Sequence, residues 1–373
     1  MKPTDKKIIL TGGKTGGHIY PALAIADMLR VAYEVHPYYI GAKDGMEKKI
    51  LAEEDIPFFG IDFAPMVGIP PLKRVTGMLW NLVGFVKSLV VIQGIRPVLI
   101  IGTGGYVAGP VLAAAFLLGV PIIIHEQNVS PGVTNKILSH IAKEIWMTFN
   151  ESAAYFPKGK RKILTGMPLR KNLQGVNREQ GRSHFGFSPS DKVLLVTGGS
   201  QGSAIINDTI KSIYVPIIQE LGYKIIHATG PSYHDKIMKG LRDEERKLLE
   251  EGKLIIRDYL MEMDLALHAA DVTICRSGAS FICELIATNS YSIQIPMKAS
   301  AGNHQLKNAK AIEKTGLGRI IEEDELTGET LLLALISLQP GENRGIMNNH
   351  VGILFGENTK EIIIKEAGKY LDV

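Results

Sequence analysis

Cysteine is scarce in this chain of 373 residues, which excludes two common ways of stabilising or equipping a protein. Cys275 and Cys283 are too few for a disulfide framework or for a zinc site with four cysteine ligands. Two thiols without such a framework are typical of a reducing compartment. We therefore expect a cytoplasmic protein.

Charge of one sign is not in excess either. Lysine and arginine total 42, and aspartate and glutamate total 38, which leaves a net charge of +4 over the whole length. Domains that bind nucleic acid usually carry a dense basic patch or stripe. The sequence therefore predicts no nucleic-acid partner, although a weak attraction to anionic surfaces is compatible with it.

The apolar runs are too short or too interrupted for a signal peptide or a membrane span. Only Ile8, Ile9 and Leu10 follow the charged start before a Thr-Gly-Gly turn, so we expect no signal peptide. Residues 97–124 contain no charge, but glycines and prolines divide them. They predict a buried strand, a helix near 110–118 and a second buried strand.

Short apolar runs alternate with helical stretches along the whole chain. The runs that we interpret as strands are residues 7–10, 36–40, 97–101, 121–125, 144–147, 192–196, 223–229, 253–257, 272–275 and 291–296. Such alternation predicts an α/β fold, in which parallel sheets are covered by helices on both faces.

A weak internal repeat indicates two domains. Residues 8–13, IILTGG, are echoed by residues 194–199, LLVTGG. Each copy is a predicted strand that runs into a glycine turn and a helix. We infer two Rossmann-like, doubly wound domains that face each other across a cleft, with a boundary near residues 157–168, where proline, glycine and basic residues mix.

The turn GGKTGGH at residues 12–18 has the features of an anion-binding site, because glycine lets backbone N–H groups approach a ligand where a helix begins. Walker A spacing requires a glycine where this chain has Ile8. The dinucleotide fingerprint requires an acidic residue after the second strand, where Gly41 and Ala42 stand. The sequence therefore favours phosphate binding without either motif.

The second glycine turn, residues 198–202, also fits the GxSxG pattern of serine hydrolases. Ser200 would be the nucleophile, with Asp264 and His304 as its partners. The first copy of the turn has no serine, so a pair of anion-binding turns accounts for both copies. A hydrolase remains an alternative prediction.

Histidine and glutamate supply the candidate catalytic groups. His18 ends the first glycine turn, where its ring can act as a base in the cleft. His125 and Glu126 follow a buried strand, but Val129 breaks the HExxH zinc motif, so we predict no metal site. Glu284 lies on the helix after CRSGAS, where its carboxylate can accept hydrogen bonds from two neighbouring sugar hydroxyls.

Residues 78–92, MLWNLVGFVKSLVVI, predict a helix that is apolar nearly all round. Such a helix is usually buried core, and composition alone favours that interpretation. The alternative is an exposed apolar patch with a basic rim of Lys73, Arg74 and Lys87, as in a peripheral protein that rests on an anionic bilayer.

Seven motifs follow one another along almost the whole chain. They are GGKTGGHIYPALAIA, GTGGYVAGP, HEQNVSPGVTNK, GMPLR, TGGSQGS followed by Asn207, CRSGAS with Glu284, and HQLKNA. In order and spacing they resemble the MurG family of glycosyltransferases, which adds N-acetylglucosamine to lipid I in bacterial peptidoglycan synthesis.

The resemblance implies a GT-B fold. An N-terminal acceptor and membrane-facing domain would span residues 1–165, a donor-binding domain residues 166–354, and a last helix, 355–373, would pack back on the first domain. It implies inverting transfer from UDP-N-acetylglucosamine to the 4-hydroxyl of the muramyl sugar, without a metal or cofactor. A nucleotide-sugar epimerase or binding protein of related architecture remains an alternative.

The resemblance also assigns the residues of a donor site. Glu284 matches the residue that holds the ribose hydroxyls, Leu260 one that lies beside the uracil, and Ser200 and Arg170 residues near the diphosphate. The other matches are Thr15, Gly16, Gly17, Asn128, Gln201, Ala279, Ser280, Phe281, Ile282, Cys283 and Gln305, with Asn207 at a further family position.

Four residues match the acceptor side, namely His18, Tyr106, Glu126 and Asn128. A base, His18 or a partner such as Glu126, would take the proton from the attacking hydroxyl as its oxygen displaces UDP. Departures from the family pattern, which bear on the fine shape of the donor pocket, stand at Lys14, Phe281, Cys283 and His304.

A lipid-linked acceptor also changes the interpretation of residues 78–92. Lipid I is held in the cytoplasmic leaflet, so the enzyme has to come to the bilayer. Together with Leu112–Leu118, residues 78–92 then become a candidate patch for an anionic membrane. On this view the protein is cytoplasmic and peripheral on the cytoplasmic face of the cell membrane.

Overall fold

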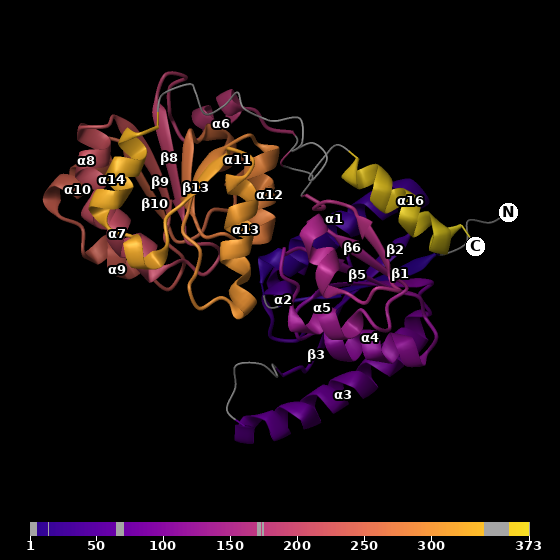
Figure 1. The fold of residues 1–373 in the computed structure, drawn as a ribbon. Coiled ribbons are helices and arrows are strands. Elements are labelled where there is room, and N and C mark those ends of the chain that lie inside the picture. Colours follow the sequence, from indigo (N-terminus) through magenta and orange to yellow (C-terminus); the bar gives the residue numbers. More distant parts are fainter. Residues whose placement is uncertain are drawn as a thin grey trace. The chain divides into compact units, whose positions relative to one another are not determined.

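The chain forms two compact units (Figure 1). The computed structural model describes residues 6–13, 15–64, 71–169, 173, 175–338 and 358–372. The first unit comprises Met1–Arg170 and Gly352–Val373, and the second comprises Lys171–Val351. Each unit is built on one parallel sheet.

The first unit alternates strands and helices. Its strands are β1 (Lys7–Gly12), β2 (His36–Ala42), β3 (Phe58–Ile61), β4 (Leu99–Gly104), β5 (Ile122–Glu126), β6 (Glu144–Met147) and β7 (Arg161–Leu164). Its helices are α1 (Gly16–Tyr33), α2 (Met46–Leu51), α3 (Pro71–Ile95), α4 (Ala108–Leu117), α5 (Val133–Leu138), the 3₁₀ helix η1 (Asn150–Tyr155) and α16 (Thr359–Leu371).

The second unit follows the same plan. Its strands are β8 (Lys192–Thr197), β9 (Tyr223–Ala228), β10 (Leu254–Arg257), β11 (Val272–Cys275), β12 (Tyr291–Gln294) and β13 (Gly318–Ile320). Its helices are α6 (Arg178–His184), α7 (Ala204–Ser212), α8 (Tyr214–Gln219), α9 (His234–Lys239), α10 (Asp243–Glu250), α11 (Met263–Ala269), α12 (Ala279–Ala287), α13 (His304–Glu313) and α14 (Gly328–Ile336), with 3₁₀ helices η3 (Ala301–Asn303) and η4 (Glu323–Glu325).

The strand order confirms the predicted α/β fold of two doubly wound sheets. The first sheet has the order β3-β2-β1-β4-β5-β6-β7 and the second β10-β9-β8-β11-β12-β13. Neighbouring strands are parallel throughout, as the pairing of β1 with β2 and β4 and of β8 with β9 and β11 illustrates. The two strands of the internal repeat, β1 and β8, thus hold equivalent inner positions.

All ten predicted strands are present, and three more were missed. The missed strands are β3, β7 and β13, and each lies at an edge of its sheet. Glycine or basic residues interrupt the apolar run in each of them (FFGI, RKIL and GRI), whereas β10, which also lies at an edge, keeps the run LII and was predicted. β7 lies within residues 157–168, and the division between the compact units falls after it.

Successive residues of β1 explain why the inner strands are continuously apolar. Ile8 and Leu10 point into the core formed with α1 and α16, whereas Ile9 points into the core formed with α3 and α4. Side chains alternate between the faces of a strand, and here helices cover both faces. Both sets of positions must therefore be apolar.

The C-terminal helix α16 belongs to the core of the first unit. Ile363, Ala367 and Leu371, spaced by one helical turn, are buried beside α1. Glu366 on the same helix accepts a hydrogen bond of 2.7 Å from Arg161 on β7. The last segment of the chain thus completes the sheet face that the first helix covers only in part.

The uncharged residues 97–124 form β4, α4 and β5, as the glycines and prolines predicted. Helix α3 differs from the buried core helix that composition alone favoured. Its segment Thr76–Ile95 is long and apolar enough to cross a membrane, but only 22% of the most apolar stretch is buried. Leu79 and Trp80 are 61% and 53% exposed, whereas Phe85 and Ile92 pack on the core. One face of α3 therefore anchors the helix and the other is an exposed apolar surface.

Two helical glycines of opposite surroundings give a stability test. A Cβ at Gly181 on α6 would lie 2.4 Å from the backbone oxygen of Leu265 on α11, whereas a Cβ at Gly94 on α3 would meet nothing within 4 Å. Gly181→Ala is expected to lower the free energy of unfolding by about 1–3 kcal/mol through overpacking. Gly94→Ala is expected to raise it by about 0.5–1 kcal/mol through helix propensity.

Denaturant titration followed by far-ultraviolet circular dichroism measures both effects. Equal midpoints for Gly181→Ala and the wild type would show that α6 and α11 do not approach as closely as described.

Candidate functional site

In both sheets the strand order reverses at the first strand, because later strands are added on both of its sides. From β1 the chain moves to β2 on one side and later to β4 on the other, and β8 stands in the same relation to β9 and β11. In open parallel sheets, ligands bind outside the carboxyl ends of the strands at such a point. Ligand-binding residues are therefore expected in the loops that follow β1, β4 and β5 and in those that follow β8 and β11.

The glycine turns of the first unit are packed too tightly for any side chain. A Cβ at Gly12 would lie 2.1 Å from Oγ1 of Thr103, at the end of β4. A Cβ at Gly105, whose φ is +81°, would lie 2.5 Å from the carbonyl oxygen of Gly13. The turn after β1 and the turn after β4 thus fix each other through backbone contact.

A buried carboxylate lies against the first glycine turn. Glu47, at the start of α2, is fully buried, and its Oε1 accepts a hydrogen bond of 2.8 Å from the N–H of Ala42. A Cβ at Gly13 would lie 2.5 Å from that oxygen. Burial, and then the negative charge of Glu47, raise the pKa of Tyr106. Sequence analysis missed Glu47, because an acidic residue in a first helical turn usually indicates only an exposed helix start.

His18 lies in the first turn of α1 with a partly exposed ring. Its Nδ1 is 3.0 Å from Oε1 of Gln127, which follows β5. The amide group of Gln127 also bonds to the buried ring of His125, and Nε2 of His125 bonds to the carbonyl oxygen of Gly166. Burial lowers the pKa of His125 to about 4, although the bond to Gly166 opposes this shift.

The carboxylate of Glu126 is buried and fully occupied. Its Oε1 accepts hydrogen bonds from the backbone N–H and side-chain amide of Asn128, at 2.9 and 3.0 Å. Its Oε2 accepts from the N–H of Gly132 at 3.3 Å and from Nδ2 of Asn135 at 2.8 Å. Glu126 therefore holds the loop after β5 in shape. Sequence analysis did not single out Asn135, which lies on the next helix.

The glycine turn of the second unit is as crowded as the first. Gly202 has a φ of +76°, and a Cβ there would lie 2.0 Å from the carbonyl oxygen of Thr229. A Cβ at Gly230 would lie 2.4 Å from the carbonyl oxygen of Gln201. The turn after β8 is thus fixed against the turn after β9.

Asn207, a predicted site residue, is fully buried on α7. Its Nδ2 donates a hydrogen bond of 2.8 Å to the carbonyl oxygen of Thr229, and its Oδ1 lies 3.0 Å from Nε2 of His227. Burial lowers the pKa of His227 to about 3, so this ring is neutral at physiological pH. Asn207 therefore tethers the start of α7 to the end of β9.

Arg276 of the CRSGAS motif connects several loop ends of the second unit. It donates hydrogen bonds to Oγ of Ser203 at 2.8 Å and to the carbonyl oxygen of Ile295 at 3.1 Å. It also forms an ion pair of 2.6 Å with Glu323. The nearly buried guanidinium thus links the loops after β8, β11, β12 and β13.

Helix α12 begins at Ala279, within the CRSGAS motif, and carries the predicted donor residues Ala279–Glu284. Ile282 and Cys283 are fully buried, and Glu284 is 5% exposed. Burial, and then the charge of Glu284, raise the pKa of the Cys283 thiol well above its usual value. Cys283 is therefore a core residue whose thiol stays protonated and unreactive at physiological pH.

The remaining predicted residues fall into two sets, one in each unit. In the second, Ser200 and Gln201 lie on the turn after β8, Leu260 is buried after β10, and Gln305 on α13 accepts a hydrogen bond from the N–H of Met297 at 2.9 Å. Those of the first unit are Thr15, Gly16, Gly17, His18, Tyr106, Glu126 and Asn128. Two of the positions that we discussed, Lys14 and Arg170, lie outside the described residues.

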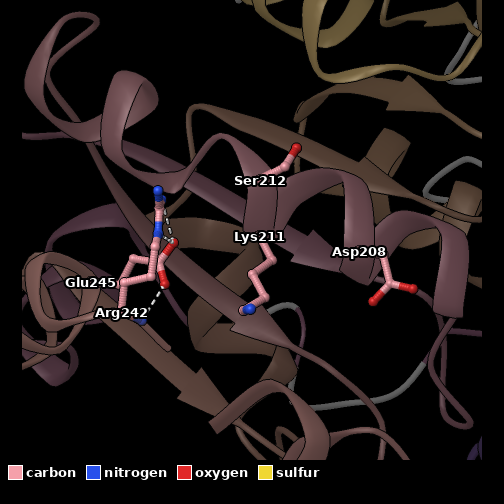
Figure 2. Close-up of a pocket in the computed structure, with 5 residues that line it drawn as sticks. All are labelled: Asp208, Lys211, Ser212, Arg242 and Glu245. Carbon is pink, nitrogen blue, oxygen red and sulfur yellow. Dashed lines mark hydrogen bonds and ion pairs between the residues drawn. The ribbon is translucent and has the colours of Figure 1, made fainter. Parts of the chain in front are cut away.

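A pocket of the second unit contains none of these residues (Figure 2). It is lined by Asp208, Lys211, Ser212, Arg242 and Glu245. Figure 2 shows the guanidinium of Arg242 directed at Glu245, and these groups lie 2.7 Å apart. Both carboxylates of this pocket have a basic partner, because Glu245 pairs with Arg242 and Asp208 with Lys236, at 3.2 Å.

Among the described residues, no three His, Cys, Asp or Glu side chains are grouped to hold a metal ion.

The chain matches the models of two domains of one family. Residues 8–147 match the glycosyltransferase family 28 N-terminal domain, and residues 193–358 match the glycosyltransferase family 28 C-terminal domain. A protein from Desulforudis audaxviator is 39% identical over 89% of each chain. One from Halalkalibacterium halodurans is 34% identical over 97% of this chain and 100% of the relative.

Both relatives carry the name UDP-N-acetylglucosamine--N-acetylmuramyl-(pentapeptide) pyrophosphoryl-undecaprenol N-acetylglucosamine transferase. Among solved structures, Acinetobacter baumannii MurG is 25% identical, with a TM-score of 0.72 over 98% of this chain and 99% of that one. The chain therefore belongs to the MurG family of N-acetylglucosamine transferases, within glycosyltransferase family 28.

Proposed function

We propose that this enzyme transfers N-acetylglucosamine from UDP-N-acetylglucosamine to the muramyl 4-hydroxyl of undecaprenyl-pyrophosphoryl-N-acetylmuramyl-pentapeptide (lipid I), which forms lipid II. The observation that carries the proposal is the family match, since relatives named for this reaction align over 87–97% of the chain. A serine hydrolase or an epimerase is not favoured by these relatives. The family resemblance implies a metal-independent single displacement, for which the first unit offers a base and the second the starts of two helices.

Most of the residues matched to a donor site lie in the second unit, whereas Thr15, Gly16, Gly17 and Asn128 lie in the first. Helices α7 and α12 begin at the carboxyl edge of the second sheet, where the N–H groups of a first helical turn and the positive end of the helix dipole favour a diphosphate. Glu284, almost buried on α12, offers two carboxylate oxygens to the ribose hydroxyls. Leu260 supplies an apolar contact for the uracil, and Ser200 a hydroxyl for the diphosphate.

The acceptor is assigned to the first unit, with His18 as the base. Glu126 is the less suitable base because four hydrogen bonds already occupy its carboxylate. Glu126 and Asn128 instead shape the loop beside the acceptor. The ring of His18 is partly exposed, and Nδ1 is the nitrogen that Gln127 engages. Its Nε2 is therefore the atom that can take a proton from the substrate.

The bonds of the reaction balance without a cofactor. The acceptor oxygen forms a bond to the anomeric carbon as the bond from that carbon to the diphosphate oxygen breaks, so the configuration inverts. The hydroxyl proton moves to Nε2 of His18, and UDP leaves with the bonding electron pair. Backbone N–H groups of the glycine turn and of the helix starts meet its growing negative charge.

His18→Ala is expected to lower kcat by about 10²- to 10⁴-fold, because the acceptor loses its base. The KM for UDP-N-acetylglucosamine should stay near the wild-type value, since His18 is not among the residues matched to the donor site. Steady-state transfer to a short-chain lipid I analogue measures both constants. His140→Ala, which changes an exposed histidine of the same unit, is the control. An unchanged kcat for His18→Ala would remove His18 from this role.

Glu284→Gln is expected to raise the KM for UDP-N-acetylglucosamine by about 10- to 100-fold, because a charge-assisted hydrogen bond to the ribose is lost. Glu313→Gln, an exposed change on α13, should leave it unaltered. Competition by UDP and by 2′-deoxy-UDP gives a second readout. If Glu284→Gln still discriminates between these nucleotides as the wild type does, the carboxylate does not bind the ribose.

The acceptor is anchored in a bilayer, and α3 offers the surface that could reach it. Met78, Leu79, Trp80 and Leu82 are each more than half exposed, and α4, which packs on α3, adds Phe116 and Leu117 at its end. Leu112 is fully buried, so only this last part of the predicted 112–118 segment contributes to the surface. Of the expected basic rim, Lys87 forms an ion pair with Asp62, and the side chains of Lys73 and Arg74 lie outside the described residues.

The triple variant Leu79→Ser, Trp80→Ser, Leu82→Ser is expected to bind anionic vesicles at least about 100-fold more weakly, because each side chain contributes roughly 1–2 kcal/mol when it leaves water. Co-sedimentation with vesicles of phosphatidylcholine and phosphatidylglycerol measures the binding. Val31→Ser, which alters an exposed apolar residue on α1, is the matched control. Wild-type sedimentation of the triple variant would assign α3 another partner.

A further inference from the structure

A line of three side chains connects the backbone at the end of the first unit to the proposed catalytic histidine. It runs from the carbonyl oxygen of Gly166 through His125 and Gln127 to His18. His125 and Gln127 are buried, and His18 is partly exposed. Each link is a hydrogen bond whose direction can be derived in turn from the chemistry of its atoms.

The first link fixes the tautomer of His125. Its Nε2 lies 3.1 Å from the carbonyl oxygen of Gly166, which can only accept, so Nε2 carries the hydrogen. Because burial lowers the pKa of this ring to about 4, it is neutral at physiological pH and has a single N–H. Nδ1 of His125 is therefore an acceptor.

The second link fixes the orientation of the Gln127 amide. One atom of this group lies 3.0 Å from Nδ1 of His125 and also 3.0 Å from the backbone carbonyl oxygen of His125. Both of these atoms accept hydrogen bonds, so the group that faces them has to be the NH₂. Two independent acceptors thus give the same orientation, and the amide oxygen is left to point at His18.

The third link fixes His18. The amide oxygen of Gln127 lies 3.0 Å from Nδ1 of His18 and can only accept. We infer that His125 and Gln127 are positioning residues that hold neutral His18 as its Nδ1–H tautomer, with the lone pair on Nε2. This role in catalysis rests on the proposed function, because it prepares the nitrogen that would take the acceptor proton.

The arrangement has a chemical consequence in the reaction. When Nε2 takes the proton, Nδ1–H keeps its bond to Gln127, and the oxygen end of the amide dipole faces the new positive charge. A neutral amide does this more weakly than a carboxylate would. The ring therefore keeps its orientation during the proton transfer, and its partner on the Nδ1 side is a neutral amide and not a carboxylate.

Nuclear magnetic resonance of the full chain, labelled with ¹⁵N in its histidine rings, tests the inference directly. Long-range ¹H–¹⁵N correlation spectra distinguish the two neutral tautomers, and the spectrum of His18→Gln identifies the His18 signals. At a pH at which His18 is neutral, we expect the wild type to show protonated Nδ1 and unprotonated Nε2. A neutral His18 ring protonated on Nε2 in the wild type would overturn the inference.

Gln127→Met removes the acceptor while keeping a side chain of similar length. We expect its His18 ring to exchange between both tautomers, and kcat to fall about 10- to 100-fold with little change in the KM for UDP-N-acetylglucosamine. Thr103→Val is the matched control, because the Thr103 hydroxyl lies 2.7 Å from the backbone carbonyl oxygen of His18 and 3.3 Å from that of Thr11, and it does not bond the ring of His18. Its tautomer should be that of the wild type.

Two outcomes separate the inference from the proposed function. If His18 keeps the Nδ1–H tautomer in Gln127→Met, the side-chain line does not set it, and the inference fails even if His18 is the base. If the tautomer changes in Gln127→Met but kcat does not, the positioning is confirmed and His18 is not the base of the reaction.

Discussion

Both candidate sites depend on one constraint. Two loops of each sheet approach each other so closely, backbone to backbone, that a Cβ atom would not fit between them. In the first unit it occurs where Gly105 meets Gly13, and in the second where Gly202 meets Thr229 and Gly230 meets Gln201. Each contact joins the loops that follow two strands of one sheet. Because no side chain fills these corners, N–H groups remain close enough to the surface to bind an anion. The last glycine of the second repeat, Gly199, meets a different requirement, because its φ is +85° and a Cβ there would meet nothing within 4 Å.

Buried polar side chains hold the loops around these corners. Glu126 is saturated by donors of its own loop and of α5, and Arg276 connects several loop ends of the second unit. Asn207 ties α7 to the end of β9. An unpaired buried polar group costs free energy, so each network tolerates few other loop conformations. The residues that would touch substrates, such as His18 and Ser200, lie at the more exposed margins of these networks.

The exposed apolar face of α3 is not explained by the packing of the fold. A helix that served only the fold would bury its apolar residues, yet Leu79 and Trp80 are more than half exposed while Ile92 joins the core. Exposed apolar area of this kind is costly in water and indicates an interaction site. The proposed membrane contact uses this surface, and the polar loops at the carboxyl edge of the sheet remain available to the substrates.

The fold class and the inner strands could be predicted from the sequence, because a strand covered on both faces is a local apolar run between glycine turns. His18, Glu126 and Glu284 were predicted as site residues for a similar reason, since they stand at the end of such a run or turn or on the helix that follows it. The edge strands β3, β7 and β13 were missed because glycine or basic residues interrupt their apolar runs. The exposure of α3 could not be read from its composition either, because a core helix has the same composition.

Only the tertiary structure assigned the roles of Glu47, Gln127, Asn135 and Arg276. Each acts through partners on other elements, and local sequence does not record which elements will be neighbours. The tautomer of His18 is the clearest case. The position of the proton on the His18 ring is set by Gln127, His125 and the carbonyl of Gly166, which lie far from His18 in the sequence. A hydrogen bond depends on the distance between atoms in space and not on their separation along the chain.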